Sequence, residues 1–481
     1  MKSKTHAYPS VQLFIGGEWV NSKEHLEIVN PSDENQIGLL PVVSKEQLDS
    51  ALSAAQEGFA IWSRTAPLER SRVILDASRL MRERCEEIAQ SISLELGKPI
   101  RQSRLEVIRG CEFFEWDAAE GQRLYGRVIP SALHMRNLVL RQPIGCVASF
   151  SPWNFPMSQP ARKIAGALAS GCSVILKPAE QTPAGSIHIA RAFEDAGLPP
   201  GVLNLVFGQP ADISEYLIPR EEIRLVAFTG STAVGRSLTM LASANMTPVL
   251  MELGGHAPVI VCDDVDAASA GAVSAIRKMR NAGQVCTSPT RFYVHEKLYP
   301  DFADSFMQQI ETMKVGDGLS EDTDMGPVAH LGRIEALQGL VDDATERGAR
   351  LLTGGLRRKG KGYFFEPTVL SEVPDDAQIM QVEPFGPVAV LNPVASLDKG
   401  IEMANSVPYG LAAYAFTHSA ANVDRLINEM EAGNLSINTL EASLPETPFG
   451  GVKASGYGRE GGDEGLLHYT VVKNVMHRIG I

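Results

Sequence analysis

Cysteine is scarce in this chain, and its pattern argues against two kinds of site. The 481 residues include six cysteines, with no Cys-x-x-Cys pair and no histidines close to them. Such spacing disfavours both a disulfide framework and a structural zinc site. We therefore expect unpaired thiols in a reducing compartment and no bound metal. The six are Cys85, Cys111, Cys146, Cys172, Cys262 and Cys286.

Long apolar runs are also missing. No uncharged stretch is long enough to cross a bilayer. The apolar residues from Val11 to Ile15 are followed at once by Gly16 and Gly17, so they are too few for a secretory signal. The chain is therefore expected to be cytoplasmic and not to bind membranes.

An excess of positive charge is absent as well. The formal net charge is −13 at pH 7, which argues against a nucleic-acid partner or an anionic membrane surface. A local basic pocket for a small anionic substrate is compatible with this total. The length predicts two or three domains, and the expected partners are small molecules.

The apolar pattern divides the chain into a helical layer and two α/β regions. Residues 45–122 have helical spacing, whereas from Leu138 short β-branched runs alternate with helical segments. That alternation predicts parallel sheets with helical crossovers. The first region is expected to hold strands at 144–150, 173–176, 203–207 and 224–228 and helices at 183–196 and 211–217. The second is expected to hold strands at 259–261 and 290–294 and helices at 267–281 and 299–313.

Two segments at predicted strand ends are candidates for binding a nucleotide. The segment FTGSTAVG, which contains Gly230, follows a strand and opens a helix, the usual context of a phosphate-binding loop. It lacks both the Gly-x-Gly-x-x-Gly pattern and a P-loop ending, and Gly230 could serve only the turn. Lys177 and Glu180 follow another strand and could reach ribose hydroxyls. Alternatively, they are a solvated lysine and a glutamate favoured by a helix dipole.

Two proline-bracketed loops present polar groups. In SPWNFP, two prolines flank Asn154 and would hold its amide as a fixed donor, as an oxyanion hole requires. In EPFGP, the rigid turn presents the Glu383 carboxylate. Glycine-rich segments follow at 448–453 and 456–462. These segments and the EPFGP turn could equally have a structural role only.

Cys286 lies in a run of small, uncharged residues, and Glu252 precedes it by 34 positions. A thiol beside closely approaching backbone suits a nucleophile that attacks carbonyl groups, with a separate carboxylate as base. The alternative is a buried cysteine that only fills space. The accompanying motifs favour the nucleophile.

Together these motifs resemble the aldehyde dehydrogenase superfamily. The chain carries, in order, WNFP, KPAE, FTGSTAVG, MELGG, GQVC, EPFGPV and PFGGVK, and the resemblance extends from Phe14 to the last strand. It implies an α/β fold with a doubly wound NAD-binding domain (1–124 and 144–253) and an α/β catalytic domain (254–453). It also implies a small β-ribbon oligomerisation domain (125–143 and 467–481), with ribbon strands within 125–142 and 469–476. Such ribbons build homodimers, often paired into homotetramers.

The resemblance also implies a role for each matching residue. Cys286 matches the nucleophile, Asn154 the oxyanion donor and Glu252 the base that activates water. Glu383 and Phe385 match contacts of the nicotinamide ribose, and Trp153, Gly230 and Ser231 line the cofactor path. Lys177 and Glu180 match contacts of the adenosine ribose. Because a carboxylate at Glu180 accepts from a free 2′-hydroxyl and repels a 2′-phosphate, the implied cofactor is NAD rather than NADP.

Within the superfamily, WNFPMSQPARK and RNAGQVCTSPTRF resemble the semialdehyde branch. There, arginines matching Arg162 and Arg280 bind the distal carboxylate, with Gln159 on the same helix as Arg162 and Ser443 as the nearest match to a loop serine. The implied substrate is succinate semialdehyde. The alternatives are 2-ketoglutarate semialdehyde, a phosphonate-bearing aldehyde and a broader range of aldehydes. Ser288 stands where some members carry a second cysteine, so a disulfide switch is not expected.

Two other classes of function use the same fold. A CoA-acylating enzyme normally lacks the water-activating carboxylate, and a non-catalytic scaffold would be expected to have lost the nucleophile or the base. Because Glu252 and Cys286 are both present, the sequence favours a hydrolytic aldehyde dehydrogenase.

Overall fold

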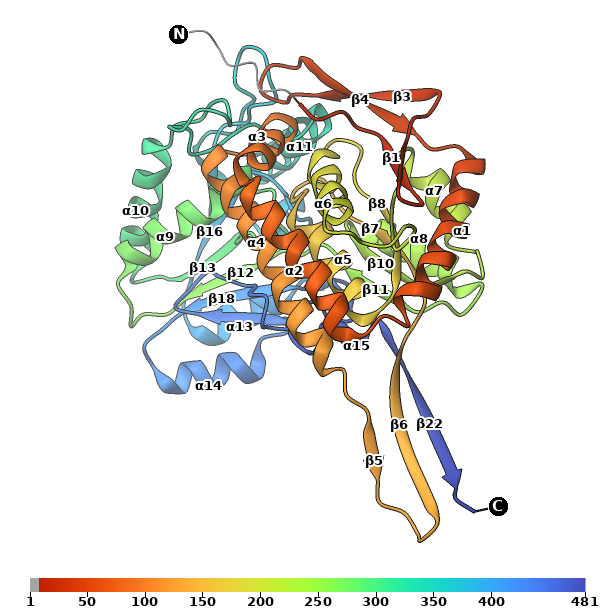
Figure 1. Cartoon of the computed structure of the whole chain (residues 1–481). Helices are drawn as coiled ribbons and strands as arrows, with labels where there is room; N and C mark the ends of the chain where they lie inside the picture. Colours follow the sequence, from red (N-terminus) through yellow and green to blue (C-terminus); the bar gives the residue numbers. More distant parts are fainter. Residues whose placement is uncertain (1–7, 481) are drawn as a thin grey trace.

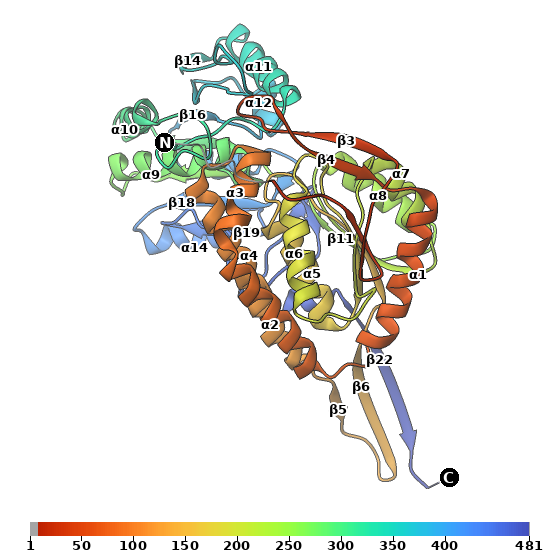
Figure 2. The same ribbon diagram turned by 45° about the horizontal axis from the view of Figure 1, so that its top comes forward.

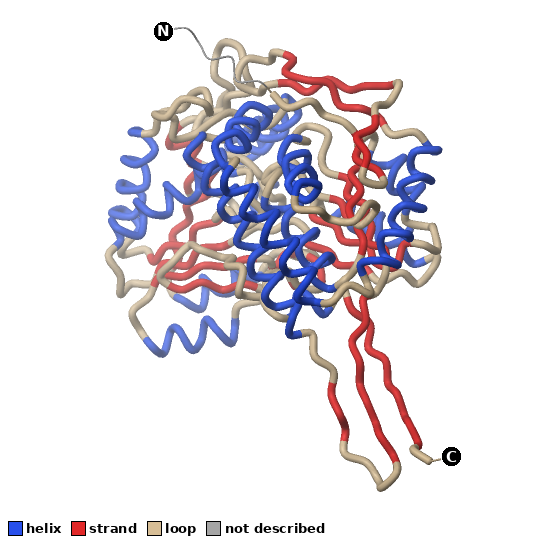
Figure 3. The backbone as a smooth tube through the Cα atoms, in the orientation of Figure 1, coloured by secondary structure: helices blue, strands red, loops and turns tan. Residues whose placement is uncertain are grey.

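The computed structural model describes residues 8–480. Residues 1–7 and 481, which the predicted domain bounds include, lie outside the described residues. The body of the molecule holds two large sheets, each surrounded by helices, and a narrow three-stranded arm projects from it (Figures 1 and 3). Each large sheet has its own apolar core, as expected for an α/β chain of this length.

The first sheet has eight strands in the order β2-β1-β9-β8-β7-β10-β11-β21. Its central strands are parallel, and the chain moves outward from β7 to β9 and then returns to β10 on the other side. The strand order therefore reverses between β7 and β10, where ligands bind in doubly wound sheets. The strands are β1 (Leu13–Ile15), β2 (Glu18–Val20), β7 (Cys146–Phe150), β8 (Ser173–Lys177), β9 (Leu203–Leu205), β10 (Ile223–Thr229), β11 (Val249–Glu252) and β21 (Gly456–Tyr457).

The second sheet has seven strands in the order β14-β15-β16-β13-β12-β18-β19, and all neighbours except β14 and β15 are parallel. The strands are β12 (Pro258–Val261), β13 (Arg291–His295), β14 (Arg350–Thr353), β15 (Thr368–Ser371), β16 (Val388–Val394), β18 (Ala412–Phe416) and β19 (Asn434–Ile437). Two further pairs of strands lie outside the large sheets: β3 (Glu24–Val29) pairs with β4 (Gln36–Val42), and β17 (Tyr409–Gly410) pairs with β20 (Val452–Lys453).

The predicted helical layer is confirmed by four helices, of which α2 and α4 cross one side of the molecule (Figure 2). They are α1 (Lys45–Trp62), α2 (Pro67–Glu83), α3 (Cys85–Leu96) and α4 (Ile100–Glu120). Around the first sheet lie α5 (Ser158–Ser170), α6 (Ala184–Asp195), α7 (Pro210–Leu217) and α8 (Thr232–Ser243). The remaining helices are α9 (Ala267–Met279), α10 (Tyr299–Thr312), α11 (Leu331–Glu346), α12 (Gln378–Gln381), α13 (Leu397–Asn405), α14 (Ala420–Glu429) and α15 (Glu464–Leu467), with 3-10 turns η1 (Gly121–Arg123) and η2 (Arg280–Gly283).

One predicted helix ends earlier than expected. The spacing predicts a helix over 267–281, but α9 ends at Met279. Asn281 and Ala282 have left-handed backbones, with φ of 51° and 52°, which non-glycine residues adopt at a cost. The chain therefore turns sharply just before Cys286.

The arm consists of β5 (Arg127–Ile129), β6 (Met135–Pro143) and β22 (Thr470–Arg478), with β6 in the middle (Figure 1). All nine residues of β22 pair with β6. Both outer strands leave one edge unpaired within the described chain, and exposed backbone edges of this kind are available for pairing with another strand.

No helix within residues 8–480 has the length and apolar character needed to span a membrane. The same residues contain no cluster of three or more His, Cys, Asp or Glu side chains suited to hold a metal ion. All six cysteines are unpaired, as expected.

Candidate active site

Two cavities meet at Cys286. One, of about 400 Å³, is lined by Trp153, Gly230 and Glu383. The other, of about 490 Å³, is lined by arginines. Cys286 and Gln159 border both cavities, so a small molecule in either one would approach the same thiol. This arrangement suits a cysteine that acts on one ligand in the presence of another.

The first cavity continues into a larger hollow of about 770 Å³ that reaches Lys177 and Glu180. The two share the residues at the ends of β7 and β10, where the strand order reverses: Pro152, Trp153, Thr229, Gly230 and Ser231. Gly230 is required there, because a Cβ would stand 2.3 Å from the Phe228 ring. An extended ligand could therefore lie along the sheet edge.

The lining of this path fits a nicotinamide dinucleotide. Helix α8 begins at the path, with Ser231 as its N-cap, and helix N-termini attract phosphate groups. The hydroxyls of Ser151 and Thr229 also border the path, and both are buried without a hydrogen-bond partner among the described residues. Polar groups left unpaired by the protein are available to a polar ligand.

The predicted ribose contacts lie at the two ends of this path. At one end, Lys177 forms an ion pair with Glu180, and burial lowers the pKa of the Lys177 ammonium. At the other end, burial raises the pKa of Glu383 to about 8. Phe385 meets Trp153 edge to face, with ring centroids 5.4 Å apart, so the aromatic pair forms one wall.

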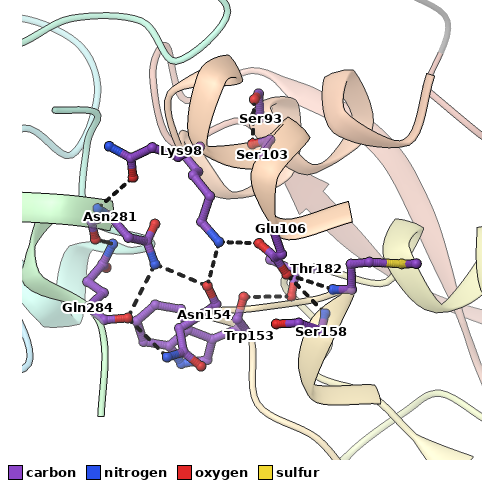
Figure 4. Close-up of polar contacts among 12 residues, drawn as sticks. Ser93, Lys98, Ser103, Glu106, Trp153, Asn154, Ser158, Thr182, Asn281 and Gln284 are labelled. Atoms are coloured by element: carbon purple, nitrogen blue, oxygen red, sulfur yellow. Dashed lines mark hydrogen bonds and ion pairs between the residues drawn. The ribbon is translucent and has the colours of Figure 1, made fainter. Parts of the chain in front are cut away.

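Asn154 is held by a buried polar network (Figure 4). Its backbone carbonyl accepts hydrogen bonds from Lys98 Nζ and Asn281 Nδ2, both at 3.0 Å. Lys98 forms a buried ion pair with Glu106, whose other carboxylate oxygen accepts the backbone N–H of Met157 at 2.9 Å. The loop that presents the Asn154 side chain is therefore fixed from both ends.

The Asn154 side chain points toward the turn before Cys286. Its Nδ2 donates to the Gln284 carbonyl at 3.0 Å, and Asn281 Nδ2 donates to the same oxygen at 3.2 Å. A side-chain amide nitrogen has two hydrogens, so the second Asn154 hydrogen is available to a ligand. The left-handed residues 281 and 282 thus connect the asparagine loop with the cysteine loop.

Burial disfavours the charged form of both the thiol and the candidate base. Burial, with smaller contributions from the carboxylates of Glu383 and Glu252, raises the pKa of Cys286 to about 12, and Arg162 opposes this rise. Burial also raises the pKa of Glu252 well above its usual range, with a further contribution from Glu460. Neither Glu252 oxygen has a hydrogen-bond partner among the described residues. Glu252 is not among the residues that line the two cavities at Cys286, but its charge acts on the thiol.

The charged groups that influence the pKa of Glu252 were not identified from the sequence. Lys163 Nζ and Glu460 Oε1 form a buried ion pair at 2.7 Å, and Lys163 partly offsets the rise in the Glu252 pKa. A signal was available, because Lys163 directly precedes the apolar run 164–168 within α5 and Glu460 interrupts a glycine-rich segment. Lys98 and Glu106 were missed for a different reason, since nothing nearby in the sequence indicates their contact with the asparagine loop.

The second cavity contains all four residues expected to bind a substrate: Gln159, Arg162, Arg280 and Ser443. Arg162 is 7% exposed, donates through Nη2 to Ser443 Oγ and stacks on Phe113 with its Cζ 3.9 Å from the ring centroid. Its Nη1 is buried without a hydrogen-bond partner among the described residues. Neither Arg162 nor Arg280 forms an ion pair within residues 8–480, so both charges are available to an anion.

Two further arginines line this cavity that the sequence did not single out. Arg109 lies on α4 and Arg277 on the last turn of α9. Their spacing is typical of solvated helix faces, so no local pattern distinguishes them from ordinary surface arginines.

Known proteins resemble this chain over nearly its whole length. Residues 19–475 match the model of the aldehyde dehydrogenase family. The chain is 43% identical over 478 residues to the putative 4-(hydroxymethyl)benzenesulfonate dehydrogenase TsaD2 of Comamonas testosteroni, covering 99% of each chain. It is 37% identical to the succinate-semialdehyde dehydrogenase [NADP(+)] GabD of Escherichia coli, covering 96% of each.

A solved structure shares the whole fold. The succinate-semialdehyde dehydrogenase of Burkholderia pseudomallei superposes with a TM-score of 0.96, at 36% identity and with 100% of both chains covered. The doubly wound sheet, the second α/β sheet and the arm confirm the expected fold class. The chain belongs to the aldehyde dehydrogenase family.

Proposed function

We propose that this protein oxidises an aldehyde with a distal anionic group to the corresponding acid, with NAD as the preferred cofactor. Members of the family act on aldehydes with NAD or NADP. The observation that supports the distal anion is Arg162, a buried guanidinium with one unpaired nitrogen in the cavity that Cys286 borders. Burial lowers the pKa of Arg162, and the carboxylates of Glu460, Glu252 and Asp117 offset only part of that effect. An anion on the unpaired nitrogen would therefore stabilise the buried charge.

In the proposed reaction, the Cys286 thiolate forms a bond to the aldehyde carbon, and the carbonyl electron pair moves onto oxygen. The free hydrogen of the Asn154 amide and the Cys286 backbone N–H stabilise that oxyanion. NAD, when bound, supplies the acceptor for the hydride that leaves the carbon. The oxyanion then reforms its carbonyl, which leaves a thioester on Cys286.

Glu252 acts in the second half of the reaction. Its carboxylate takes a proton from water as the water oxygen attacks the thioester, and the carbon–sulfur bond then breaks to release the acid and the thiolate. The raised pKa of Glu252 makes its ionised form a stronger base than an ordinary carboxylate. Arg162 is the neighbouring charge that favours the thiolate of Cys286.

The preference for NAD rests on Glu180. Its carboxylate, at the far end of the coenzyme path beside Lys177, would accept a bond from a free 2′-hydroxyl and repel a 2′-phosphate. Replacing this carboxylate with a hydroxyl should remove the repulsion. Glu180→Ser should therefore gain activity with NADP, and no gain would count against this assignment.

Succinate semialdehyde is the first substrate to test, because the E. coli and B. pseudomallei relatives carry that name and its carboxylate could pair with Arg162 and Arg280. A sulfonate is the second candidate anion, since the Comamonas relative is named for one. The carboxylate of 2-ketoglutarate semialdehyde, or the phosphonate of a phosphonate-bearing aldehyde, could bind the same two arginines.

We also propose that the chain assembles as a homodimer or homotetramer through the arm. Its apolar side chains are exposed in the single chain, among them Val128, Leu133, Val472 and Met476. Exposed apolar side chains on an unpaired sheet edge favour association with another copy.

The proposal is tested by initial rates of NADH formation with succinate semialdehyde, 2-ketoglutarate semialdehyde and uncharged butanal. We expect kcat/KM for the anionic aldehydes to exceed that for butanal by at least about tenfold. One hydrogen bond to a charged group contributes roughly 1.5–3 kcal/mol, which corresponds to a factor of this size. Equal or better rates with butanal would leave the aldehyde chemistry intact and remove the distal anion from the proposal.

A further inference from the structure

The cavity that leads to Cys286 carries more positive charge than one carboxylate requires. Its lining includes four arginines and two glutamates, with no lysine or aspartate, so two positive charges are in excess. Arg162 and Arg280 are used by the proposed function. Arg109 and Arg277 are not, and both face the same space.

Arg277 is a partly buried cation whose ion-pair partner could be replaced by a ligand. Its side chain is 15% exposed, and its ion pair with Glu441 spans 3.3 Å to a carboxylate that is 58% exposed. Arg109 is similar, with Glu112 at 3.0 Å and both side chains partly exposed. Ion pairs with exposed carboxylates are weak, so an anion entering the cavity could replace Glu441 on Arg277 at small cost.

The cavity is also larger than a four-carbon aldehyde needs. Its volume of about 490 Å³ lies within the range of roughly 300–1,000 Å³ typical of pockets for drug-sized ligands. Five large apolar side chains line it together with the arginines: Phe113, Phe155, Phe449, Leu105 and Ile108. Aromatic walls favour a flat, apolar spacer.

We propose that Arg277, with Arg109 beside it, forms an outer anion-binding position, and that the cavity accepts aromatic aldehydes whose sulfonate or carboxylate lies across the ring from the carbonyl. This inference rests on the proposed function, because the reaction at Cys286 is the same. It adds a substrate class and a specificity-determining residue. The ring lies between the phenylalanine walls, and the anion takes the place of Glu441 on Arg277.

Arg277 also has a structural neighbour that the test must separate. Its guanidinium lies beside the Tyr414 hydroxyl, which donates to the Thr287 carbonyl at 2.7 Å, next to Cys286. If Arg277 only supported this loop, its loss would slow every substrate equally. A specificity role instead changes the ratio between charged and uncharged aldehydes.

The test compares kcat/KM for 4-sulfobenzaldehyde and benzaldehyde in the wild-type enzyme and in Arg277→Met. We expect the sulfonated-to-unsubstituted ratio to fall by about 10- to 100-fold, the range for losing a hydrogen-bonded charge. Glu441→Gln should raise the same ratio, because it removes the competing carboxylate, and this exposed position tests the proposal even if Arg277→Met folds poorly. Arg350→Met, at an exposed ion-paired arginine on β14, is the matched control and should leave the ratio unchanged.

Two results would overturn the inference: an unchanged ratio in Arg277→Met, including an equal loss for both aldehydes, or an unchanged ratio in Glu441→Gln. Its failure is distinct from that of the proposed function. If wild type prefers succinate semialdehyde over butanal but shows no preference for 4-sulfobenzaldehyde over benzaldehyde, only the outer position is wrong. If neither charged aldehyde is preferred, the proposed function is also wrong.

Discussion

Burial sets the protonation of both Cys286 and Glu252, and it does so in the same direction. The Cys286 pKa is raised to about 12 and that of Glu252 is raised well above its usual range. The first step of the proposed reaction needs the thiolate, and the last needs the carboxylate. Both steps should therefore become faster as protons are removed.

The pH dependence of turnover follows from these directions. Because the pKa of Glu252 is raised well above its usual range, the fraction of this carboxyl present as base grows over a higher pH range than for an ordinary glutamate. We expect kcat to increase from pH 6 to pH 9, measured as steady-state NADH formation with saturating aldehyde. A kcat that is constant or falls over this range would contradict the assignment of Glu252 as the base.

Substitution separates the two roles. Glu252→Gln keeps the size and removes the base, so thioester formation should continue while hydrolysis slows by about 10²- to 10⁴-fold, the usual contribution of a general base. Rapid mixing should show a burst of NADH followed by stalled turnover. Cys286→Ala is the control and should produce no burst while still binding NAD. A Glu252→Gln enzyme without a burst would place the role of Glu252 before hydride transfer.

At the scale of elements, the asparagine loop depends on an ion pair contributed by the helical layer. Lys98, just before α4, and Glu106, within α4, are both buried, and together they bind the backbone of the loop at Asn154 and Met157. Removing one partner of a buried pair leaves an uncompensated charge. The layer therefore stabilises the site as well as the fold.

Lys98→Met should lower the free energy of unfolding by about 3–5 kcal/mol and reduce kcat, because the asparagine loop loses its anchor. Thermal unfolding and initial rates measure the two effects. Arg79→Met, which removes an exposed ion pair with Glu83, is the matched control and should cost less than about 1 kcal/mol. Equal losses of stability in the two variants would show that the buried pair has no special role.

Local patterns predicted most elements but not the contacts between them. The strand at 173–176 and the helix at 183–196 appear as β8 and α6 within two residues of their expected bounds, because apolar periodicity reflects local burial. The end of α9 was wrong, because the left-handed turn at Asn281 and Ala282 depends on bonds to Asn154 and Gln102 from distant segments. The Lys98–Glu106 and Lys163–Glu460 pairs also form only after folding.

The roles of the candidate site residues remain predictions from the sequence. Motif order was enough to single out Cys286, Glu252 and Asn154, and the structure brings Cys286 and Asn154 to adjoining loops. The Arg162–Ser443 contact could be expected only from the resemblance, since 281 positions separate the two residues. Arg109 and Arg277 emerged only when the cavity itself was described.

At the scale of the whole molecule, the arm exposes more apolar surface than a monomer needs. Val128 is 74% exposed and Val472 is 61% exposed, and both lie on outer strands of the arm. We expect the combined substitution Val128→Glu and Val472→Glu to shift the protein toward monomers in size-exclusion chromatography with light scattering, because charged side chains block association at a sheet edge. Lys473→Gln, an exposed polar position on the same strand, should retain the assembly, and an unchanged mass in the Glu variant would contradict association through the arm.

The two sheets and their cavities converge on one thiol, so the account depends most on whether Arg162 binds the far end of the substrate. The direct measurement is the ratio of kcat/KM for succinate semialdehyde to that for butanal in wild type, Arg162→Met and the milder Ser443→Ala. We expect the ratio to fall by at least about tenfold in Arg162→Met, as the loss of a charge-assisted hydrogen bond implies, and by less in Ser443→Ala. A ratio that is the same in all three enzymes would contradict the account.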